Sequence, residues 1–560
     1  MTHAAYQLFL TPLSPVHIGT GDAYEPTSYV IQEHILYAFD SEAAYHALNP
    51  QERERLLHFT ARVTPESVLD IHKFFYERRE TLIPFAHHFL PVPHSIAEQY
   101  ENRISQPAQT EASRDIFNQL SIDRMATNPS DHSPVLFGSS LKGAIRTALL
   151  DKVNNGQDHF TKKEKEKKEA GLHPFQGDLF RYLNEREKPA FERDPLRLIH
   201  VADARYRIHD LFAPARVYFA VNRRKRAGTS PRNRESLYQR LECACPLVYR
   251  AFEGQISFQV LSGIQAHDEL PSREFWFGMQ DVALACNRFY RPLFEKEMNL
   301  LRNRRMLDEG WAQSMESLLT DSRLQNGSVF LLRVGRHSGA EAVTLNGVRW
   351  IRIIQGRNNP PTYDKEPHTL WLAAEDLRQT EGHIPFGWIL AEAFPFEAPA
   401  PEDGGLKKIF EPFMQDLRQK GSRLSDIQKA LKEARAKILE QHELERKEEE
   451  RRREERARQE QERAEREARL AAMTEEERAI ETFRACFEQN KQGPYKKGSL
   501  FDQERLNFFN RMQTVAEVRT LKEAAKLLQE TIDWGQPKKE RKRDFLAWIK
   551  KAMESETPQT

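Results

Sequence analysis

Cysteine is scarce in this chain of 560 residues, and its positions exclude the usual cysteine-based sites. The four cysteines are Cys243, Cys245, Cys286 and Cys486, and they form neither a C-x-x-C pair nor a zinc-binding spacing. We therefore expect free thiols in a reducing cytosol, a cytoplasmic protein and no bound metal.

Long apolar runs and an excess of charge are also lacking. No apolar run approaches the roughly 18 residues that a membrane-spanning helix needs, and the first residues do not resemble a secretory signal. We therefore expect no membrane partner. The formal net charge is only +1, so a nucleic-acid surface would have to be a local patch.

Motifs for common cofactors are missing as well. The sequence contains no P-loop, no dinucleotide-binding fingerprint and no H-E-x-x-H zinc motif. The dipeptides His209-Asp210 and His267-Asp268 have no companions that would complete a metal site. No cofactor is expected and no catalytic constellation is visible. Whether the protein is an enzyme stays uncertain, and a non-enzymatic role is favoured.

The most informative stretch runs from Val135 to Leu150. Residues 135–137 form a short apolar run typical of a buried strand, and 138–140 read as a turn. Residues 141–150 have apolar side chains at helical spacing, with basic residues at 142 and 146 on another face. A glycine, free amides at a helix start and two cations suit a phosphate. An ordinary capped helix with two solvated cations is the alternative.

Residues 138–148, with the sequence GSSLKGAIRTA, resemble the G-S-S-[LI]-K-G-x-[IL]-R segment of the RAMP proteins of CRISPR effector complexes. Residues 13–21 (LSPVHIGTG) resemble the segment after the first strand of that family, and 335–339 (GRHSG) resemble its late glycine-rich loop. As a set, the motifs are most similar to the end-capping RAMP subunits of type III-A (Csm) complexes. The likeness extends over roughly residues 5–395.

Three glycine turns, at 17–21, 138–146 and 335–339, therefore carry basic or histidine side chains. If they converge in space, they form a groove that follows a phosphate backbone. A cationic loop after residue 221 could add further phosphate contacts, although a solubilising turn explains it equally well. The predicted RNA-binding residues are His17, Gly19, Gly21, Gly138, Ser139, Ser140, Lys142, Arg146, Arg223, Arg224, Gly335, Arg336, His337 and Ser338.

The order of strands and helices is typical of an α+β fold. We expect two ferredoxin-like (RAMP/RRM-like) units with a β-α-β-β-α-β order, at 1–195 with insertions and at 196–400. The family resemblance implies that an insertion such as 84–134 forms a thumb across bound RNA.

The last third of the sequence departs from the resembled family. Residues 443–469 are nearly all Glu and Arg, with opposite charges four apart and no sustained heptad of apolar residues. We predict a solvent-exposed single helix over 421–473, with disorder as the alternative.

A capping box at Thr474–Glu477 begins a small helical domain at 474–553. Docking a neighbouring subunit, recruiting a nuclease and stabilising the chain are all open roles for it. The cations at 538–543 could reach nucleic acid or could simply be a solvated helix start.

The resemblance implies an RNA-binding structural subunit of a type III-A CRISPR antiviral ribonucleoprotein. Such a subunit caps the backbone at the guide-RNA 3′ end and contributes to guide-RNA maturation. Its expected partners are the guide RNA, the other RAMP subunits and a recruited nuclease. The alternative is a metal-independent endoribonuclease that processes precursor guide RNA, with His17 as acid–base. A third hypothesis places the function in the helical C-terminus alone.

Overall fold

A computed structural model describes residues 2–61, 65–104, 110–111, 114–115, 120–160, 172–208, 213–226, 237–261, 269–354, 359–398, 400–401 and 406–555. Its internal contacts divide the chain into two compact units, Met1–Glu440 and Gln441–Thr560, each described by itself below. The His-Asp dipeptides at 209–210 and 267–268 lie outside the described residues. The cationic loop after residue 221 is described only as far as Arg226.

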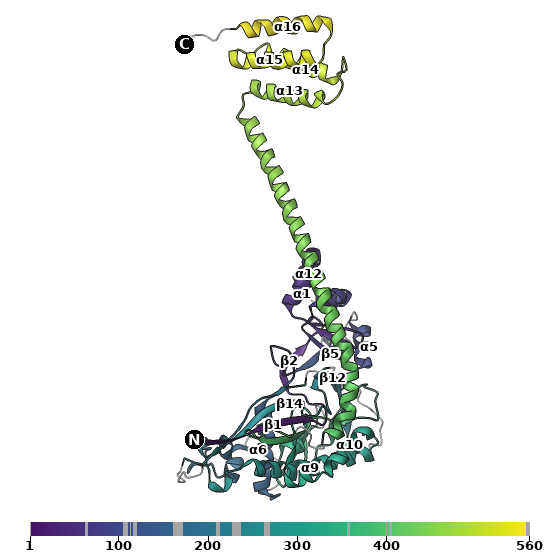
Figure 1. The fold of residues 1–560 in the computed structure, drawn as a ribbon, viewed down its shortest axis with the longest axis vertical. Coiled ribbons are helices and arrows are strands. Elements are labelled where there is room, and N and C mark those ends of the chain that lie inside the picture. Colours follow the sequence, from purple (N-terminus) through teal and green to yellow (C-terminus); the bar gives the residue numbers. More distant parts are fainter. Residues whose placement is uncertain are drawn as a thin grey trace. The chain divides into compact units, whose positions relative to one another are not determined.

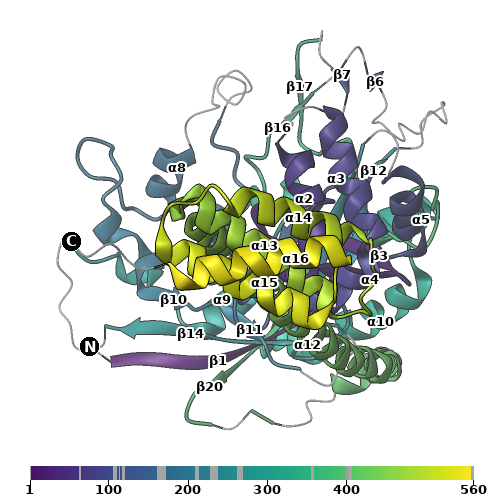
Figure 2. The same ribbon diagram turned by 90° about the horizontal axis from the view of Figure 1, so that it is seen from above.

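Unit 1 is built around two large sheets. The first, sheet A, has the strand order β15-β20-β1-β14-β11-β9, with β10 also paired to β14. Figure 2 shows the long strands β20, β1 and β14 of this sheet beside one another. All of its pairs are antiparallel. The bounds are β1 Thr2–Pro12, β9 Val135–Leu136, β10 Ile199–Val201, β11 Ala204–Tyr206, β14 Phe252–Val260, β15 Val329–Arg333 and β20 Trp388–Pro395.

Helices α6 (Gly138–Asn154) and α9 (Met279–Asn303) pack against each other and on sheet A. Helix α9 buries the apolar face that its helical spacing predicts, and Phe294 on that face lies 4.5 Å from the Trp388 ring of β20. The shorter helices α10 (Glu309–Leu319) and α11 (Ser322–Asn326) follow. The indole N–H of Trp311 donates to the Leu13 carbonyl, 2.6 Å away, and so fixes α10 to the end of β1.

Sheet B has the strand order β19-β18-β12-β13-β8-β2. Its bounds are β2 Gly19–Tyr24, β8 Ile122–Met125, β12 Ala215–Arg224, β13 Tyr238–Ala244, β18 Thr369–Ala374 and β19 Ile384–Pro385. Both large sheets contain strands from either side of the predicted boundary at 195/196. The structure therefore has a mixed α/β fold, as predicted, but does not confirm two ferredoxin-like units.

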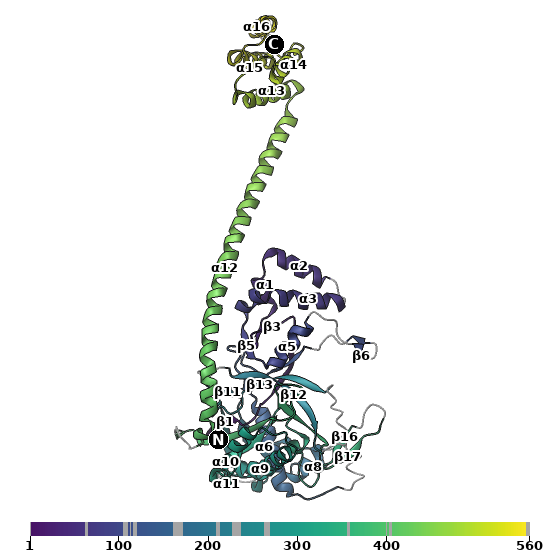
Figure 3. The same ribbon diagram turned by 90° about the vertical axis from the view of Figure 1, so that its right-hand side faces the viewer.

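A smaller subdomain is inserted between β2 and β8. A three-stranded sheet of β3, β4 and β5 packs with helices α1 to α4 around its own apolar core, and α5 follows β5. Figures 1 and 3 show it at the end of unit 1 opposite α6 and α9. The bounds are β3 Tyr29–Gln32, β4 Ile35–Ala38, β5 His88–Pro91, α1 Ser41–Ala47, α2 Pro50–Thr60, α3 Pro65–Glu77, α4 Arg79–Leu82 and α5 His94–Arg103.

The remaining elements of unit 1 are short. They are β6 Thr110–Glu111, β7 Arg114–Asp115, α8 Leu172–Leu179, β16 Ile351–Ile353, β17 Thr362–Asp364 and the 3₁₀ helices η1 Ile83–Phe85, η2 Phe191–Arg193, η3 Pro195–Leu198, η4 Arg273–Phe275 and η5 Ala340–Val343.

The charged helix α12 spans Lys407–Ala472. Within unit 1, Phe410 stacks on Tyr249 with ring centroids 5.8 Å apart, and Leu431 and Ile438 pack against the core of the small subdomain. From 441 onward the described side chains of α12 are almost all exposed, and ion pairs such as Arg458–Glu462 form four residues apart. The predicted charged helix is present and begins earlier than residue 421.

Unit 2 ends in four helices, α13 Glu475–Lys491, α14 Leu500–Met512, α15 Val518–Trp534 and α16 Lys539–Glu554. They enclose a separate core that includes Phe483, Phe487 and Phe508. The capping box between Thr474 and Glu477 is formed in both directions. The predicted helical C-terminal region is thus confirmed. Among the described residues, no helix is both long and apolar enough to cross a membrane.

Candidate nucleic-acid interface

The turn at 335–339 follows strand β15 and lies directly against the turn at 17–21. The Arg336 amide donates to the His17 carbonyl oxygen, 2.8 Å away. Gly335 has φ +81°, and a Cβ atom there would stand 2.3 Å from the same carbonyl oxygen. Only glycine fits this close approach, so the sequence of the third turn fixes its contact with the first.

His17 supports the first turn from inside. Its side chain is 1% exposed, and Nδ1 lies 2.6 Å from the Glu242 carbonyl oxygen of β13. A carbonyl only accepts, so Nδ1 carries the proton and Nε2 is left as an acceptor. Burial lowers the pKa of this histidine, so the ring is held neutral. The histidine expected to contact a ligand therefore serves to position the turn.

The glycines of the first turn are the exposed part of it. Gly19 and Gly21 lie in β2, which is the edge strand of sheet B. A Cβ atom on Gly19 would stand 2.8 Å from Nε2 of His17, while Gly21 has φ +91° and open space around it. Because glycine has no side chain, a ligand can approach the exposed backbone closely at these two positions.

Arg336 and His337 lie over the strands of sheet B. The Arg336 guanidinium pairs with Asp123 of β8 at 2.7 Å, and its side chain is 42% exposed. His337 stacks on Trp371 of β18 with ring centroids 4.4 Å apart, and its Nε2 lies 2.9 Å from Gln239 of β13. Burial, reinforced by nearby Arg336, lowers the pKa of His337 to about 3. Ser338 is buried.

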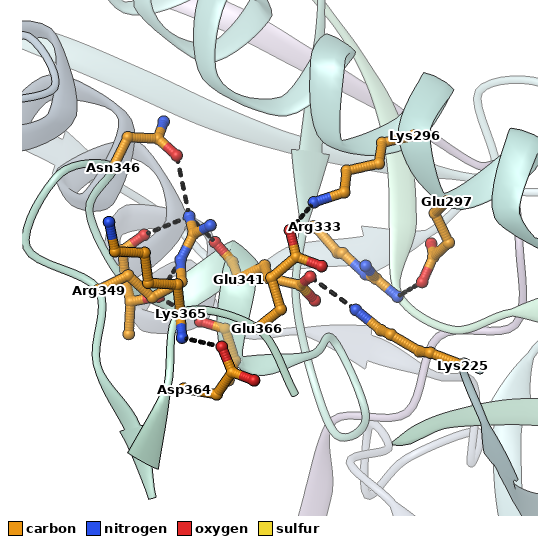
Figure 4. A network of polar contacts seen from close by, with 12 residues as sticks. Lys225, Lys296, Glu297, Arg333, Glu341, Asn346, Arg349, Asp364, Lys365 and Glu366 are labelled. Atoms are coloured by element: carbon orange, nitrogen blue, oxygen red, sulfur yellow. Dashed lines mark hydrogen bonds and ion pairs between the residues drawn. The ribbon is translucent and has the colours of Figure 1, made fainter. Parts of the chain in front are cut away.

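A network of charged side chains anchors the segment that follows this turn (Figure 4). Lys225 pairs with Glu341 of η5 at 2.6 Å, and both side chains are 13% exposed. In the same region Lys296 of α9 pairs with Glu366, and Arg333 pairs with Glu297 at 2.9 Å. The Lys225–Glu341 ion pair therefore holds the end of strand β12 beside the turn at 335–339.

The two arginines predicted to bind RNA at the end of β12 differ in how free their guanidinium groups are to contact a phosphate. Arg223 donates to the carbonyl oxygens of Leu377 and Gln379, at 3.3 and 3.0 Å, and burial lowers its pKa. Arg224 is exposed and forms no ion pair with a described residue. Arg224 is therefore the better phosphate contact of the two.

The start of α6 is organised differently from the predicted phosphate cradle. The Gly138 amide already donates to the Asp203 carboxylate, 2.7 Å away. A Cβ atom on Gly138 would stand 2.2 Å from the Val201 carbonyl oxygen, so glycine is required by packing. The Ser140 amide donates to the Phe137 carbonyl within the chain, and the Ser139 side chain is exposed. The Gly138 amide is thus not free for an anion, because an acidic side chain occupies it.

The two cations of α6 also differ. The Arg146 guanidinium pairs with Asp194 at 2.8 Å and donates to the Tyr182 hydroxyl and to Gln176. This internal network leaves Arg146 little freedom to bind a phosphate. Lys142 is half-buried and forms no ion pair with a described residue, and burial lowers its pKa.

Backbone hydrogen bonds connect all three turns. The Ala126 amide donates to the Ile18 carbonyl at 2.7 Å, and the Val135 amide at the entry to α6 donates to the Ala126 carbonyl at 2.9 Å. The Tyr290 hydroxyl donates to the Ala144 carbonyl in α6 at 3.0 Å and also lies near η5. The first and third turns are in direct contact, and the second is one short strand away.

Sequence reasoning missed Asp123, Gln239, Trp371 and above all Glu242. The Glu242 carboxylate is fully buried, accepts from the Met125 amide at 2.9 Å and lies 3.1 Å from Nε2 of His88. A charged residue between the apolar residues Leu241 and Cys243 of this strand is the signal that could have indicated this position. Among the described residues no group of three or more His, Cys, Asp or Glu side chains could hold a metal ion.

Comparison with known proteins finds one matching family model. The model of the RAMP superfamily matches residues 9–279. Over this region the chain is similar to the RAMP superfamily. The RAMP match contains the turns at 17–21 and 138–146 together with Asp123 and Glu242, whereas the turn at 335–339 lies beyond it. No curated protein matches the sequence.

Two solved structures are similar to this chain. One is Csm5 of T. onnurineus, with 16% identity, coverage of 68% of this chain and 99% of that chain, and a TM-score of 0.37. The other is a Csm–crRNA–target RNA ternary complex of a type III-A CRISPR-Cas system, with 17% identity, coverage of 69% and 100%, and a TM-score of 0.40.

Proposed function

We propose that this protein is an RNA-binding structural subunit of a cytoplasmic type III-A CRISPR ribonucleoprotein. In this role it caps the backbone at the guide-RNA 3′ end and contributes to guide-RNA maturation. The observation that carries the proposal is the direct contact between the turns at 17–21 and 335–339 on sheet B. This contact puts exposed glycine backbone and a partly exposed arginine on one surface, as a phosphate backbone requires.

The chemistry of the surface favours phosphate contact over base reading. Arg336 and Arg224 offer exposed or partly exposed guanidinium groups, and Gly19 and Gly21 offer backbone amides. Lys142 is a further candidate from α6. Asp123 competes with phosphate for Arg336, so bound RNA would have to displace one ion pair. His17, Gly138 and Arg146 act in this proposal by holding the turns in place.

The partners follow from the resemblance of the three motifs to the end-capping subunits. We propose the guide RNA, the neighbouring RAMP subunits and a recruited nuclease as partners. The finer fold assignment, two ferredoxin-like units, belongs to the same proposal. In its favour, β1 and β10 both pair antiparallel with β14, and α6 lies between them in sequence, which is a split β-α-β arrangement.

The test compares full-length protein with the double variant Arg224→Gln/Arg336→Gln. Binding of a fluorescently labelled guide-RNA 3′ segment is measured by anisotropy over a range of salt concentrations. Each lost phosphate contact should reduce the slope of log affinity against log salt by about 0.7. Arg302→Gln, on helix α9, is the matched control and should leave affinity and slope unchanged. Unchanged binding by the double variant would remove this surface from the proposal.

The endoribonuclease alternative requires His17 to reach the RNA. With 1% exposure and its Nδ1 hydrogen-bonded to a buried strand, His17 is poorly placed for that role. Incubation of labelled precursor RNA with the protein in EDTA separates the two functions. Intact RNA agrees with the structural subunit. Cleavage that His17→Ala abolishes would instead establish the enzyme.

A further inference from the structure

The four-helix domain of unit 2 brings two lysine-rich loops together at one end. The loop between α13 and α14 contains Lys496 and Lys497, and the loop between α15 and α16 leads into Lys538 and Lys539 (Figure 1). The Tyr495 hydroxyl lies 3.0 Å from the Gln536 carbonyl oxygen, so the first loop is joined to the second.

A buried network fixes this junction. The Arg505 side chain is fully buried and donates to the carbonyl oxygens of Thr531 and Gly535, at 2.9 and 2.7 Å, and to the Tyr495 hydroxyl at 3.0 Å. Arg505 also pairs with Asp502, which accepts from the Gly498 amide at 2.6 Å. Asp502, just after the first loop, is therefore already paired with a cation. The two loops are held rigidly beside each other without using any of their surface lysines.

Six cations cover this end of the domain, and we call the set the basic end. Lys496, Lys497, Lys538, Lys539 and Arg543 are exposed and Arg541 is half-buried. None of the six forms an ion pair with a described residue, although Glu540 and Asp544 stand on the same helix. The acidic residues Glu475, Glu476 and Glu477 are at the other end of α13 from these loops.

The basic end is unfavourable for the isolated domain. Like charges repel, and cations in the first turn of α16 interact unfavourably with the helix dipole. A bound polyanion relieves both effects. The cations are mainly lysines, which act as point charges and match the phosphate backbone without reading bases.

We propose that the basic end binds the sugar-phosphate backbone of a nucleic acid, as a second contact separate from the candidate interface of unit 1. The binding is independent of base sequence and strongly weakened by salt. It does not depend on the function proposed for unit 1, because the residues belong to a different compact unit.

The experiment uses the full-length protein and a labelled 20-nucleotide oligouridine. The variant Lys496→Gln/Lys497→Gln/Lys538→Gln/Lys539→Gln should lose at least fivefold in affinity at low salt, and its salt slope should fall by two or more. The control Lys550→Gln/Lys551→Gln removes two cations from the other end of α16 and should leave both values unchanged. If the fourfold variant and the control have the same RNA affinity and the same salt slope, the proposal is wrong.

Photocrosslinking distinguishes this contact from the one in unit 1. With 4-thiouridine RNA, crosslinked peptides from 491–499 and 535–543 support the basic end, whether or not peptides around 17–21 and 335–339 also crosslink. Crosslinks confined to unit 1 overturn the proposal. If the fourfold variant keeps its RNA affinity but no longer co-purifies with neighbouring subunits, the basic end binds an acidic protein surface, and the proposal is wrong.

Discussion

The amide of Arg336 donates a hydrogen bond to the carbonyl oxygen of His17, with 2.8 Å between nitrogen and oxygen. This bond joins a turn near the start of the chain to one that follows strand β15. Gly335 makes the approach possible, because any side chain there would collide with the same carbonyl. The candidate interface therefore depends on the absence of a single methyl group.

Gly335→Ala should lower the free energy of unfolding by roughly 2–4 kcal/mol, because the left-handed backbone disfavours alanine and the Cβ atom displaces the His17 carbonyl. Urea denaturation measures the loss. Gly21→Ala is the matched control: its φ is also positive, but nothing lies within 4 Å, so only about 1–2 kcal/mol should be lost. Equal losses of free energy of unfolding for the two variants would show that the contact between the turns does not stabilise the protein.

Asp123→Asn should increase RNA affinity about two- to fivefold at low salt, because it releases Arg336 from its ion pair and removes a negative charge from the surface. The pair is partly exposed, so stability should change by less than about 1 kcal/mol. Anisotropy titrations measure the affinity. Glu274→Gln makes the same change of charge by releasing Arg181 from an exposed pair and should have no effect. A weaker affinity for Asp123→Asn would mean that Asp123 helps to bind the RNA.

Arg250 and Glu392 form a buried ion pair with two hydrogen bonds, at 2.8 and 2.9 Å, and their side chains are 8% and 3% exposed. Glu392→Ala should cost about 3–5 kcal/mol of stability, because it leaves the Arg250 charge buried without a partner. The double variant Arg250→Met/Glu392→Leu should lose less than Glu392→Ala alone. Denaturant unfolding of the three proteins checks this order, and a greater loss in the double variant would contradict it.

Local elements could be predicted well from the sequence. The apolar run Val217–Val221 indicates a strand, which the structure shows as β12, and the apolar spacing over 281–301 indicates a helix, which is α9. Pairing partners could not be predicted in this way. Strand β1 lies between β14 and β20, and nothing in its local periodicity specifies strands so distant in sequence.

The candidate interface shows the same limit: the sequence predicts local structure but not the distant residues that contact it. The pattern around Gly138 correctly indicated a helix, but residues 138–140, which were predicted to form a turn, are the first residues of α6. The Gly138 amide, however, donates to Asp203, and Arg146 pairs with Asp194, so two supposed phosphate contacts are satisfied by distant carboxylates. A carboxylate and a phosphate suit the same amides and cations, so the motif alone cannot tell which anion is present.

Acid should destabilise unit 1 in part through His337, whose folded pKa is lowered to about 3 by burial. The unfolded chain takes up this proton below about pH 6.5 and the folded chain does not, so the free energy of unfolding falls as the pH drops from 6.5 toward 3. His337→Gln should reduce this decline by up to about 1.4 kcal/mol per pH unit. Urea denaturation at pH 7, 6, 5 and 4 measures it.

His383 offers a comparison for the same measurement, because it is fully buried and burial lowers its pKa to about 4. His383→Gln should reduce the decline in the free energy of unfolding by a similar amount down to about pH 4. The double variant should reduce the decline by the sum of the two single effects, because effects at sites without a shared partner are expected to add. If the curve of His337→Gln runs parallel to the wild-type curve between pH 6.5 and 4, the imidazole is already protonated in the fold. Its stacking on Trp371 would then be a cation–π contact, and the third turn would present two positive charges to RNA instead of one.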